Sequence, residues 1–332
     1  MKVAFGKVLV VFLVVVMSMP VEARVAGDVS RGELDDAIRA AASFLMENVR
    51  EPGIGTMGGD WAVLGLARSG LELPDGFIDT YLRNVASVLR QRGGVLDNRR
   101  TTEYSRVVLG LTAAGADPRD VAGFDLLQPL ADLERTVAQG ANGVIFSLLA
   151  LDSAGHNVPQ AITAATQATR EALVEAILEH QMADGGFSLL ALEEPGARST
   201  VDITAMALQA LAKYNNQREV RTAINRGIGF LSRNQNSDGG FSNGAMSDSN
   251  LESSVQVLVA MGELGIRMDD RRFVEGGNSV LGSVMSFQND DGGFRHSNQR
   301  PQTNLMSTEQ ALYGMVAVQR LLDGESSLYR MD

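Results

Sequence analysis

Cysteine is absent from the 332-residue sequence. Its absence excludes disulfides, a thioester, a cysteine nucleophile, a cysteine-bound zinc ion and a lipid-modified N-terminal cysteine. Aromatic residues are few, at 5%, while aliphatic residues and alanine are abundant, so helices packed through small side chains fit the composition better than a sheet-rich core. We therefore expect an all-α protein.

Clusters of basic residues are also lacking. Asp and Glu number 40 against 29 Lys and Arg, which gives a net charge of −11, and basic residues gather no further than pairs such as Arg99-Arg100. Nucleic acid and anionic membrane surfaces are therefore poor partners for this chain. The sequence predicts no metal site and no cofactor.

Long apolar runs are missing except near the N-terminus. Lys2 and Lys7 precede the apolar residues 8–17, and Val21-Glu22-Ala23 offers small residues where a signal peptidase reads. This pattern predicts a secretory signal peptide over residues 1–23, followed by a single domain over 24–332. The protein is then exported and not stably inserted in a membrane; a retained N-terminal anchor is the alternative.

A seven-residue repeat is the most regular feature of the chain. The pattern Gln-x-x-Asp-Gly-Gly-Phe begins at residues 181, 235 and 288, which is typical of stacked copies of one supersecondary unit. Its Asp can bond the backbone two residues on, and its glycines permit the positive φ that ends a helix. The Gln, which carries both a donor and an acceptor, is expected to tie neighbouring units together.

Around these repeats, two classes of predicted helix alternate. Amphipathic helices are expected over residues 30–49, 75–91, 125–138, 169–181, 218–235 and 278–288. Helices that are apolar almost all round are expected over 60–70, 101–115, 142–155, 202–212, 252–265 and 308–322. Six of each class can bury all their apolar faces as two concentric rings, with the apolar helices inside. The pattern predicts an (α/α)6 toroid; an open helical solenoid is the alternative.

The segment 227–241 resembles the repeat signature of the prenyltransferase and squalene cyclase superfamily, with Phe241 where many members have Trp. The segments 201–211, 251–256 and 306–312 resemble a secreted bacterial branch of it, and the likeness extends over roughly residues 33–322. This resemblance implies the closed toroid. It does not settle function, because one fold carries many functions.

The catalytic groups of this superfamily are mostly missing. Its class II terpene cyclases protonate their substrate with the central acid of an Asp-x-Asp-Asp-Thr-Ala segment, and residues 200–205 keep only that acid, Asp202, with Thr200 and Ile203 in place of its supporting carboxylates. The resemblance therefore leaves a cyclase with Asp202 as general acid as an alternative, which predicts a deep apolar pocket beneath Asp202. Protein prenyltransferases of this fold need a zinc-binding cysteine, which is absent.

Polar residues recur near the starts of the predicted inner helices. In five of these helices the first turn is expected to hold an acid, and in the sixth it holds Asn142. The acids are Asp60, Glu103, Asp202, Glu252 and Glu309. Helix capping and the helix dipole explain acids there. In a closed ring, however, they would surround one mouth, and together with Trp61 they form our predicted ligand site. A glycosidase-like reaction with Asp202 and Glu252 as an acidic pair is a further alternative.

The leading hypothesis is an exported, non-catalytic toroid that binds a small molecule or a cell-surface partner in or over its central cavity. It is motivated by a retained scaffold without a complete catalytic set. A structural or adhesive surface module is the remaining hypothesis, and it requires no ligand in the cavity.

Overall fold

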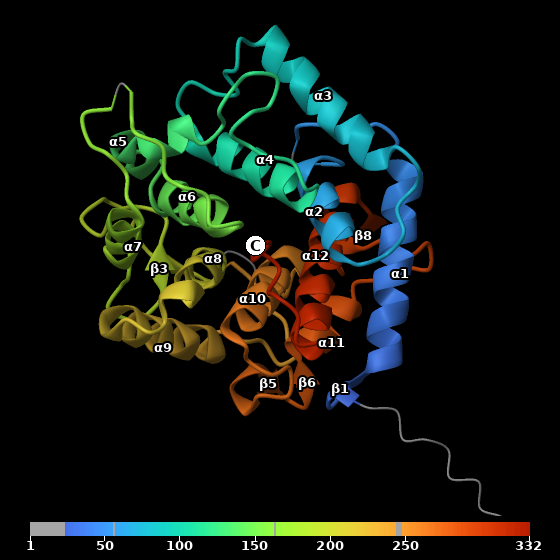
Figure 1. Cartoon of the computed structure of the whole chain (residues 1–332). Coiled ribbons are helices and arrows are strands. Elements are labelled where there is room, and N and C mark those ends of the chain that lie inside the picture. The colour runs from blue at the N-terminus through green and yellow to red at the C-terminus, as the bar shows by residue number, and fades with distance from the viewer. Residues whose placement is uncertain (1–23, 56, 163, 244–247) are drawn as a thin grey trace, which may run out of the picture.

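The computed structural model describes residues 24–332 with gaps at 56, 163 and 244–247, so the predicted signal peptide lies outside the described residues. Twelve α-helices form within this part of the chain and alternate between two concentric rings (Figure 1). The inner ring consists of α2 (Asp60–Arg68), α4 (Thr101–Ala113), α6 (Ala141–Asp152), α8 (Val201–Leu211), α10 (Leu251–Leu264) and α12 (Leu305–Leu322). The outer ring consists of α1 (Arg31–Asn48), α3 (Phe77–Gln91), α5 (Leu133–Val137), α7 (Arg170–Leu178), α9 (Arg218–Arg233) and α11 (Val280–Met285).

The inner ring is closed. Each inner helix contacts the next one along the chain, and α12 contacts α2. The outer helices span the same junction, because the first outer helix, α1, packs against the last inner helix, α12. The predicted (α/α)6 toroid is therefore confirmed, and the open solenoid is wrong, since a solenoid leaves its first and last units apart.

Two outer helices, α5 and α11, fall furthest short of their predicted lengths. Residues 125–138 form a 3-10 turn, η1 (Gln128–Ala131), followed by the five-residue α5. Pro129 supplies no N–H to the first turn, and the Asp132 side chain then accepts from the Arg135 N–H and starts a new helix. In the last outer unit, Ser279 caps α11 by accepting from the Gly282 N–H, so this helix starts two residues later than expected.

Small hairpins, which the sequence did not predict, precede four of the helices. Each is an antiparallel pair that turns the chain between the rings or leads it into α1. The pairs are β1 (Arg24–Ala26) with β2 (Val29–Ser30), β3 (Phe187–Ser188) with β4 (Ser199–Thr200), β5 (Val274–Glu275) with β6 (Asn278–Ser279), and β7 (Arg295–Ser297) with β8 (Arg300–Thr303).

The repeated glutamines join neighbouring outer units, as predicted. Gln181 Nε2 donates to the carbonyl of Ala223 in α9 at 2.8 Å, and Gln235 Nε2 donates to the carbonyl of Phe273 at 3.0 Å. Gln288 Nε2 reaches the carbonyl of Ala37 in α1 at 3.4 Å. The third repeat thus connects the last outer helix to the first.

The repeated Asp-Gly-Gly-Phe segments build the corner from outer to inner helix. In the middle repeat, Asp238 Oδ1 accepts from the Gly240 N–H at 3.0 Å, and Gly239 has a φ of +80°. A β-carbon on Gly240 would lie 2.4 Å from Ser283 Oγ, so this position has no room for a side chain. The buried Phe241 then donates its N–H to Ser254 Oγ, which fixes the corner to the first turn of α10.

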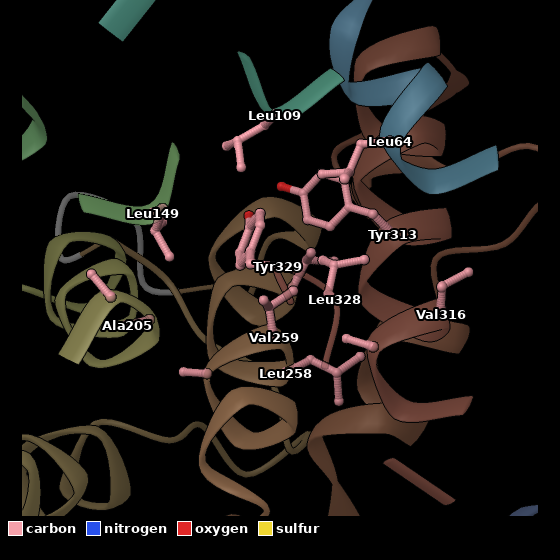
Figure 2. Close-up of a cluster of buried hydrophobic side chains, with 14 of the residues drawn as sticks. Leu64, Leu109, Leu149, Ala205, Leu258, Val259, Tyr313, Val316, Leu328 and Tyr329 are labelled. Carbon is pink, nitrogen blue, oxygen red and sulfur yellow. The ribbon is translucent and has the colours of Figure 1, made fainter. Parts of the chain in front are cut away.

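Side chains fill the lumen toward the C-terminal ends of the inner helices. Figure 2 shows Leu109 and Leu149 pointing toward Tyr313 and toward two residues of the C-terminal segment, Leu328 and Tyr329. All five are nearly or fully buried. The C-terminal segment enters the ring at its centre (Figure 1), so it closes the mouth at the C-terminal ends of the inner helices.

Side chains at that mouth hold the C-terminal segment in place. The Arg68 guanidinium, at the end of α2, donates to the carbonyls of Ser327 at 2.8 Å and Leu328 at 3.2 Å. Glu263 on α10 accepts from Ser327 Oγ at 2.6 Å and from the Tyr329 N–H at 3.1 Å. With this mouth closed, the opposite mouth is the one that leads to the polar residues predicted as a site.

Candidate functional site at the mouth of the inner ring

Side-chain caps set where the inner helices begin at the open mouth. Thr200, Asn250 and Asn304 each accept a hydrogen bond from a backbone N–H three residues later, at 3.3, 2.9 and 2.8 Å. Each cap therefore fixes the rotational phase of its helix. The second residue of α8, α10 and α12 is then Asp202, Glu252 or Met306.

The second residue of every inner helix is partly or well exposed, whereas the residues next to it are mostly buried. We call this set the rim: Trp61, Thr102, Asn142, Asp202, Glu252 and Met306. Four residues further along, one turn deeper, Phe146, Met206, Gln256 and Gln310 are again partly exposed, as side chains on the same helix face should be. We call these four the second layer.

Trp61 reaches across the lumen. Its ring centroid lies 6.0 Å from that of Phe146 and 5.9 Å from that of Tyr313. Helices α2 and α6 are not neighbours in the inner ring, because α4 lies between them. The indole therefore projects toward the centre of the mouth, with the second layer beside it and the buried Tyr313 below.

Asp60 and Glu103 do not belong to the rim, although they lie in first turns as predicted. Asp60 is fully buried: its Oδ1 accepts from the Tyr81 hydroxyl at 2.6 Å, and its Oδ2 accepts from Arg106 Nε at 2.9 Å. Glu103 pairs with the other side of Arg106, at 2.7 Å. Asp60 thus joins α2 to α3 and α4, and Glu103 holds Arg106 in place for this contact.

Glu309 corrects a prediction. It was expected in the first turn of its helix, but Asn304 caps α12 earlier, so Glu309 is the fifth residue and lies one turn deeper. It is fully buried; its Oε2 accepts from the Gly58 N–H at 3.0 Å, and its Oε1 has no partner in the described chain. Burial, and secondly the charge of Asp60, raise the pKa of Glu309 to about 8.

Asp202 and Glu252 occupy equivalent rim positions on neighbouring helices but differ in environment. Burial raises the pKa of Asp202; the negative charge of Glu252 adds to this, while a hydrogen bond from Ser253 opposes it. Asp202 Oδ1 is buried and has no partner among the described residues. Glu252, by contrast, accepts from Ser307 Oγ at 2.6 Å and contacts His296 Nδ1 at 2.5 Å.

A network of amide and hydroxyl groups lies deeper in the lumen than Asp202 and Glu252, on helices α8, α10 and α12. Gln209 Nε2 donates to the backbone carbonyl of Gln256 at 2.8 Å and to its Oε1 at 3.0 Å. Gln256 Nε2 donates to the Tyr313 hydroxyl at 3.0 Å, and that hydroxyl donates to Gln310 Oε1 at 3.2 Å. Gln209 is 2% exposed and its Oε1 lacks a partner in the described part of the chain.

Sequence reasoning missed this network, together with Phe146 and Met206. Counting four and seven residues on from Asp202, Glu252 or Met306, the residues two places after these caps, would have suggested the positions on α8, α10 and α12, because residues at that spacing share a helix face. Among the described residues no group of His, Asp or Glu side chains is arranged to hold a metal ion. In the same residues no helix is long and apolar enough to span a membrane.

The fold is shared with enzymes of several kinds at low sequence identity. A type II terpene cyclase from Scytonema matches with a TM-score of 0.55 at 13% identity, over 87% of this chain and 99% of the cyclase. An unsaturated glucuronyl hydrolase from Bacillus sp. GL1 matches with a TM-score of 0.58 at 12% identity, over 90% of this chain and 99% of the hydrolase. The protein geranylgeranyltransferase-I of Candida albicans matches with a TM-score of 0.51 at 12% identity, over 81% and 84% of the two chains.

No curated protein sequence matches the chain. The family model of the prenyltransferase alpha-alpha toroid domain matches residues 144–271 and 254–331, which together are more than half of the chain. The repeated corners lie within these ranges, and the closed double ring is the arrangement that the family description names. The chain therefore belongs to the prenyltransferase alpha-alpha toroid domain family.

Proposed function

We propose that this protein binds a small polar molecule at the open mouth of its inner ring and does not transform it. The observation that carries the proposal is the set of buried oxygens at this mouth that lack a partner: Asn142 Oδ1, Asp202 Oδ1 and Glu309 Oε1. An unpaired buried polar group costs roughly 1–3 kcal/mol. A ligand with hydrogen-bond donors would remove that cost.

The filled lumen supports binding over terpene cyclisation. A cyclase that uses Asp202 as its acid needs an apolar chamber below the acid. In that region Leu149 and Gln209 are buried, and Leu328 and Tyr329 of the C-terminal segment occupy the centre of the ring (Figure 2). The partly exposed side chains of the rim and the second layer are what this mouth offers to a small ligand, and we call the region between these two sets the recess.

Export is part of the proposal and rests on the N-terminal sequence. The basic residues Lys2 and Lys7, the apolar residues 8–17 and the small residues around 21–23 form the signal-peptide pattern. The proposed ligand is then a molecule found outside the cytoplasm. Edman sequencing of protein secreted by its host tests this part, and an N-terminus that retains residues 1–23 would contradict it.

Trp61 allows a direct test of binding, because it is the single tryptophan of the chain and lies in the recess. Protein purified from its host under native conditions should carry an extra mass in native mass spectrometry, and release of that mass should change the Trp61 fluorescence. Asp202→Asn should weaken retention at least tenfold. Asp290→Asn, the same change at an exposed position, is the control. If wild type carries no extra mass and no metabolite fraction alters the fluorescence, the proposal is wrong.

Hydrolysis of a sugar substrate is a second candidate. It is favoured by the contrast between Asp202, whose pKa burial raises, and Glu252, which His296 and Ser307 orient. Two carboxyl groups in unlike environments are a common acid and base arrangement. The structurally similar glucuronyl hydrolase is responsible for glycosaminoglycan degradation.

Unsaturated glucuronyl disaccharides are the substrates with which to test the second candidate. Product release that is seen with wild type and Asp290→Asn but lost in Asp202→Asn would establish hydrolysis and overturn non-catalytic binding. Bound disaccharide that remains intact would support binding without turnover.

A further inference from the structure

The negative charge of the recess is concentrated on one side. On α2 and α4, Arg106 balances Asp60 and Glu103. On α8, α10 and α12, none of Asp202, Glu252 and Glu309 forms an ion pair with a Lys or Arg within the described chain. His296 contacts Glu252, and the charge of Arg106 acts on Glu309 from α4. Within the described residues, this side of the recess therefore has more carboxyl groups than Lys or Arg partners.

Carbonyl and carboxyl oxygens make up most of the unmet hydrogen-bonding capacity of the inner helices, and the exception is the Ser147 hydroxyl, which can also donate. Within the described residues, every buried polar side-chain atom of these helices that lacks a partner is an oxygen. Gln209 Oε1 is the most informative, because this side chain is 2% exposed and donates its Nε2 to a backbone carbonyl, which fixes the orientation of the amide. The oxygens of Gln209 and Asp202 therefore call for donors from a bound molecule.

Two aromatic side chains adjoin this acidic side, because Trp61 lies 5.9 Å from Tyr313 of α12, measured between ring centroids. Trp61 and Phe146 are partly exposed, with ring centroids 6.0 Å apart. Aromatic faces attract cations and also accommodate methylene groups. Carboxyl groups together with nearby aromatic faces complement a molecule with a positive head and a short apolar body.

We propose that the ligand of this recess is a small alkylammonium cation with at least one N–H donor. Its ammonium group is held on the side of Asp202 and Glu252, and its apolar part lies against Trp61 and Phe146. This inference rests on the proposed binding function and specifies its ligand class. An ammonium group fits because it carries only donors, whereas an anion would meet the carboxylates with like charge.

Binding of a cation should release protons. The groups that face Glu309 are the Gly58 N–H and Asp60 from the α2 side and Arg106 from α4. Those that face Asp202 are Ser253 and Glu252 from α10. Both acids have raised pKa values, so a bound cation favours their ionised forms, and affinity for it should rise as the pH increases toward about 8.

The test compares n-butylammonium with n-butanol, which has the same carbon chain without charge, and with tetramethylammonium, which has charge without N–H. Trp61 fluorescence and calorimetry at pH 6.5 and 8.5 provide the readouts. We expect n-butylammonium to bind at least tenfold more tightly than the other two, more tightly at the higher pH, and with a proton release that calorimetry in buffers of different ionisation enthalpy detects.

Variants and the co-purified mass separate the possible outcomes. Asp202→Asn should weaken n-butylammonium binding about tenfold, and Asp290→Asn should leave it unchanged. Equal binding of n-butanol, or identification of the co-purified molecule as neutral or anionic, overturns the cation inference and leaves small-molecule binding intact. A co-purified amine supports the cation inference. No ligand-dependent change at Trp61 and no co-purified mass overturn both.

Discussion

Glu309 offers a quantitative test of the recess without any ligand. Its carboxyl group is fully buried and has a hydrogen bond to one oxygen, from the Gly58 N–H. Burial raises its pKa from an ordinary value of 4.5 to about 8. Because the folded protein binds this proton more tightly than the unfolded chain, the stabilisation is complete below pH 4.5. It is lost as the pH rises through about 8.

The size of the effect follows from the pKa difference. Between these two pKa values, stability falls by about 1.4 kcal/mol for each pH unit. Replacing Glu309 with Gln keeps the shape and removes the titration. Relative to wild type, the variant should therefore gain on the order of 3 kcal/mol between pH 5.5 and 7.5, or roughly 5 °C in melting temperature.

Urea and thermal unfolding followed by circular dichroism at pH 5.5, 6.5 and 7.5 measure this gain. The difference between variant and wild type isolates Glu309 from the other buried acids, such as Asp202 and Glu263, whose pKa values are also raised. Glu175→Gln, at an exposed position of α7, is the control and should show no such trend. Parallel stability curves for Glu309→Gln and wild type would refute the assignment of a neutral, desolvated acid.

Three further changes test the scaffold by thermal unfolding. Tyr329→Ala empties the centre of the ring and should cost about 3–5 kcal/mol, whereas Arg330→Ala, at an exposed neighbour, should cost little; equal losses would mean that the C-terminal segment does not fill the lumen. Arg106→Leu leaves Asp60 buried without its cation and should cost about 3–5 kcal/mol, with much of the loss recovered when Asp60→Asn is added; no recovery would contradict the pairing. Gln235→Ala removes the bond between outer units and should cost about 1–2 kcal/mol; no loss would show that this link is not needed.

The double ring could be predicted from the sequence because its signals are local and repeated. Alternating helix classes and the corners at 181, 235 and 288 depend on residues close together in the chain. The length of α5 could not be predicted, since Pro129 and Asp132 divide a segment that still reads as one amphipathic helix. The C-terminal filling of the lumen had no signal, because Leu328 and Tyr329 lie in a short segment without periodicity.

Only part of the site was predicted. Whether a side chain faces the lumen depends on its rotational position around the helix axis more than on the turn in which it lies. A first-turn position places a side chain near the mouth, but each residue rotates its direction by about 100°. Asp60 therefore points between helices to Arg106, whereas Trp61, one residue later, points into the lumen. Caps decide that phase, and the Asn304 cap of α12 was not recognised, which is why Glu309 was assigned to the wrong turn.

The two mouths of the ring differ because different parts of the chain meet there. At the C-terminal ends of the inner helices, Arg68 and Glu263 hold a buried segment that contributes Leu328 and Tyr329 to the core. At the N-terminal ends the helix dipoles favour negative charge, and the acids gathered there exceed what Arg106 can neutralise. Because the other mouth is closed, a ligand can enter only here, and under the proposed function we expect the uncompensated carboxyl groups to select that ligand by its charge.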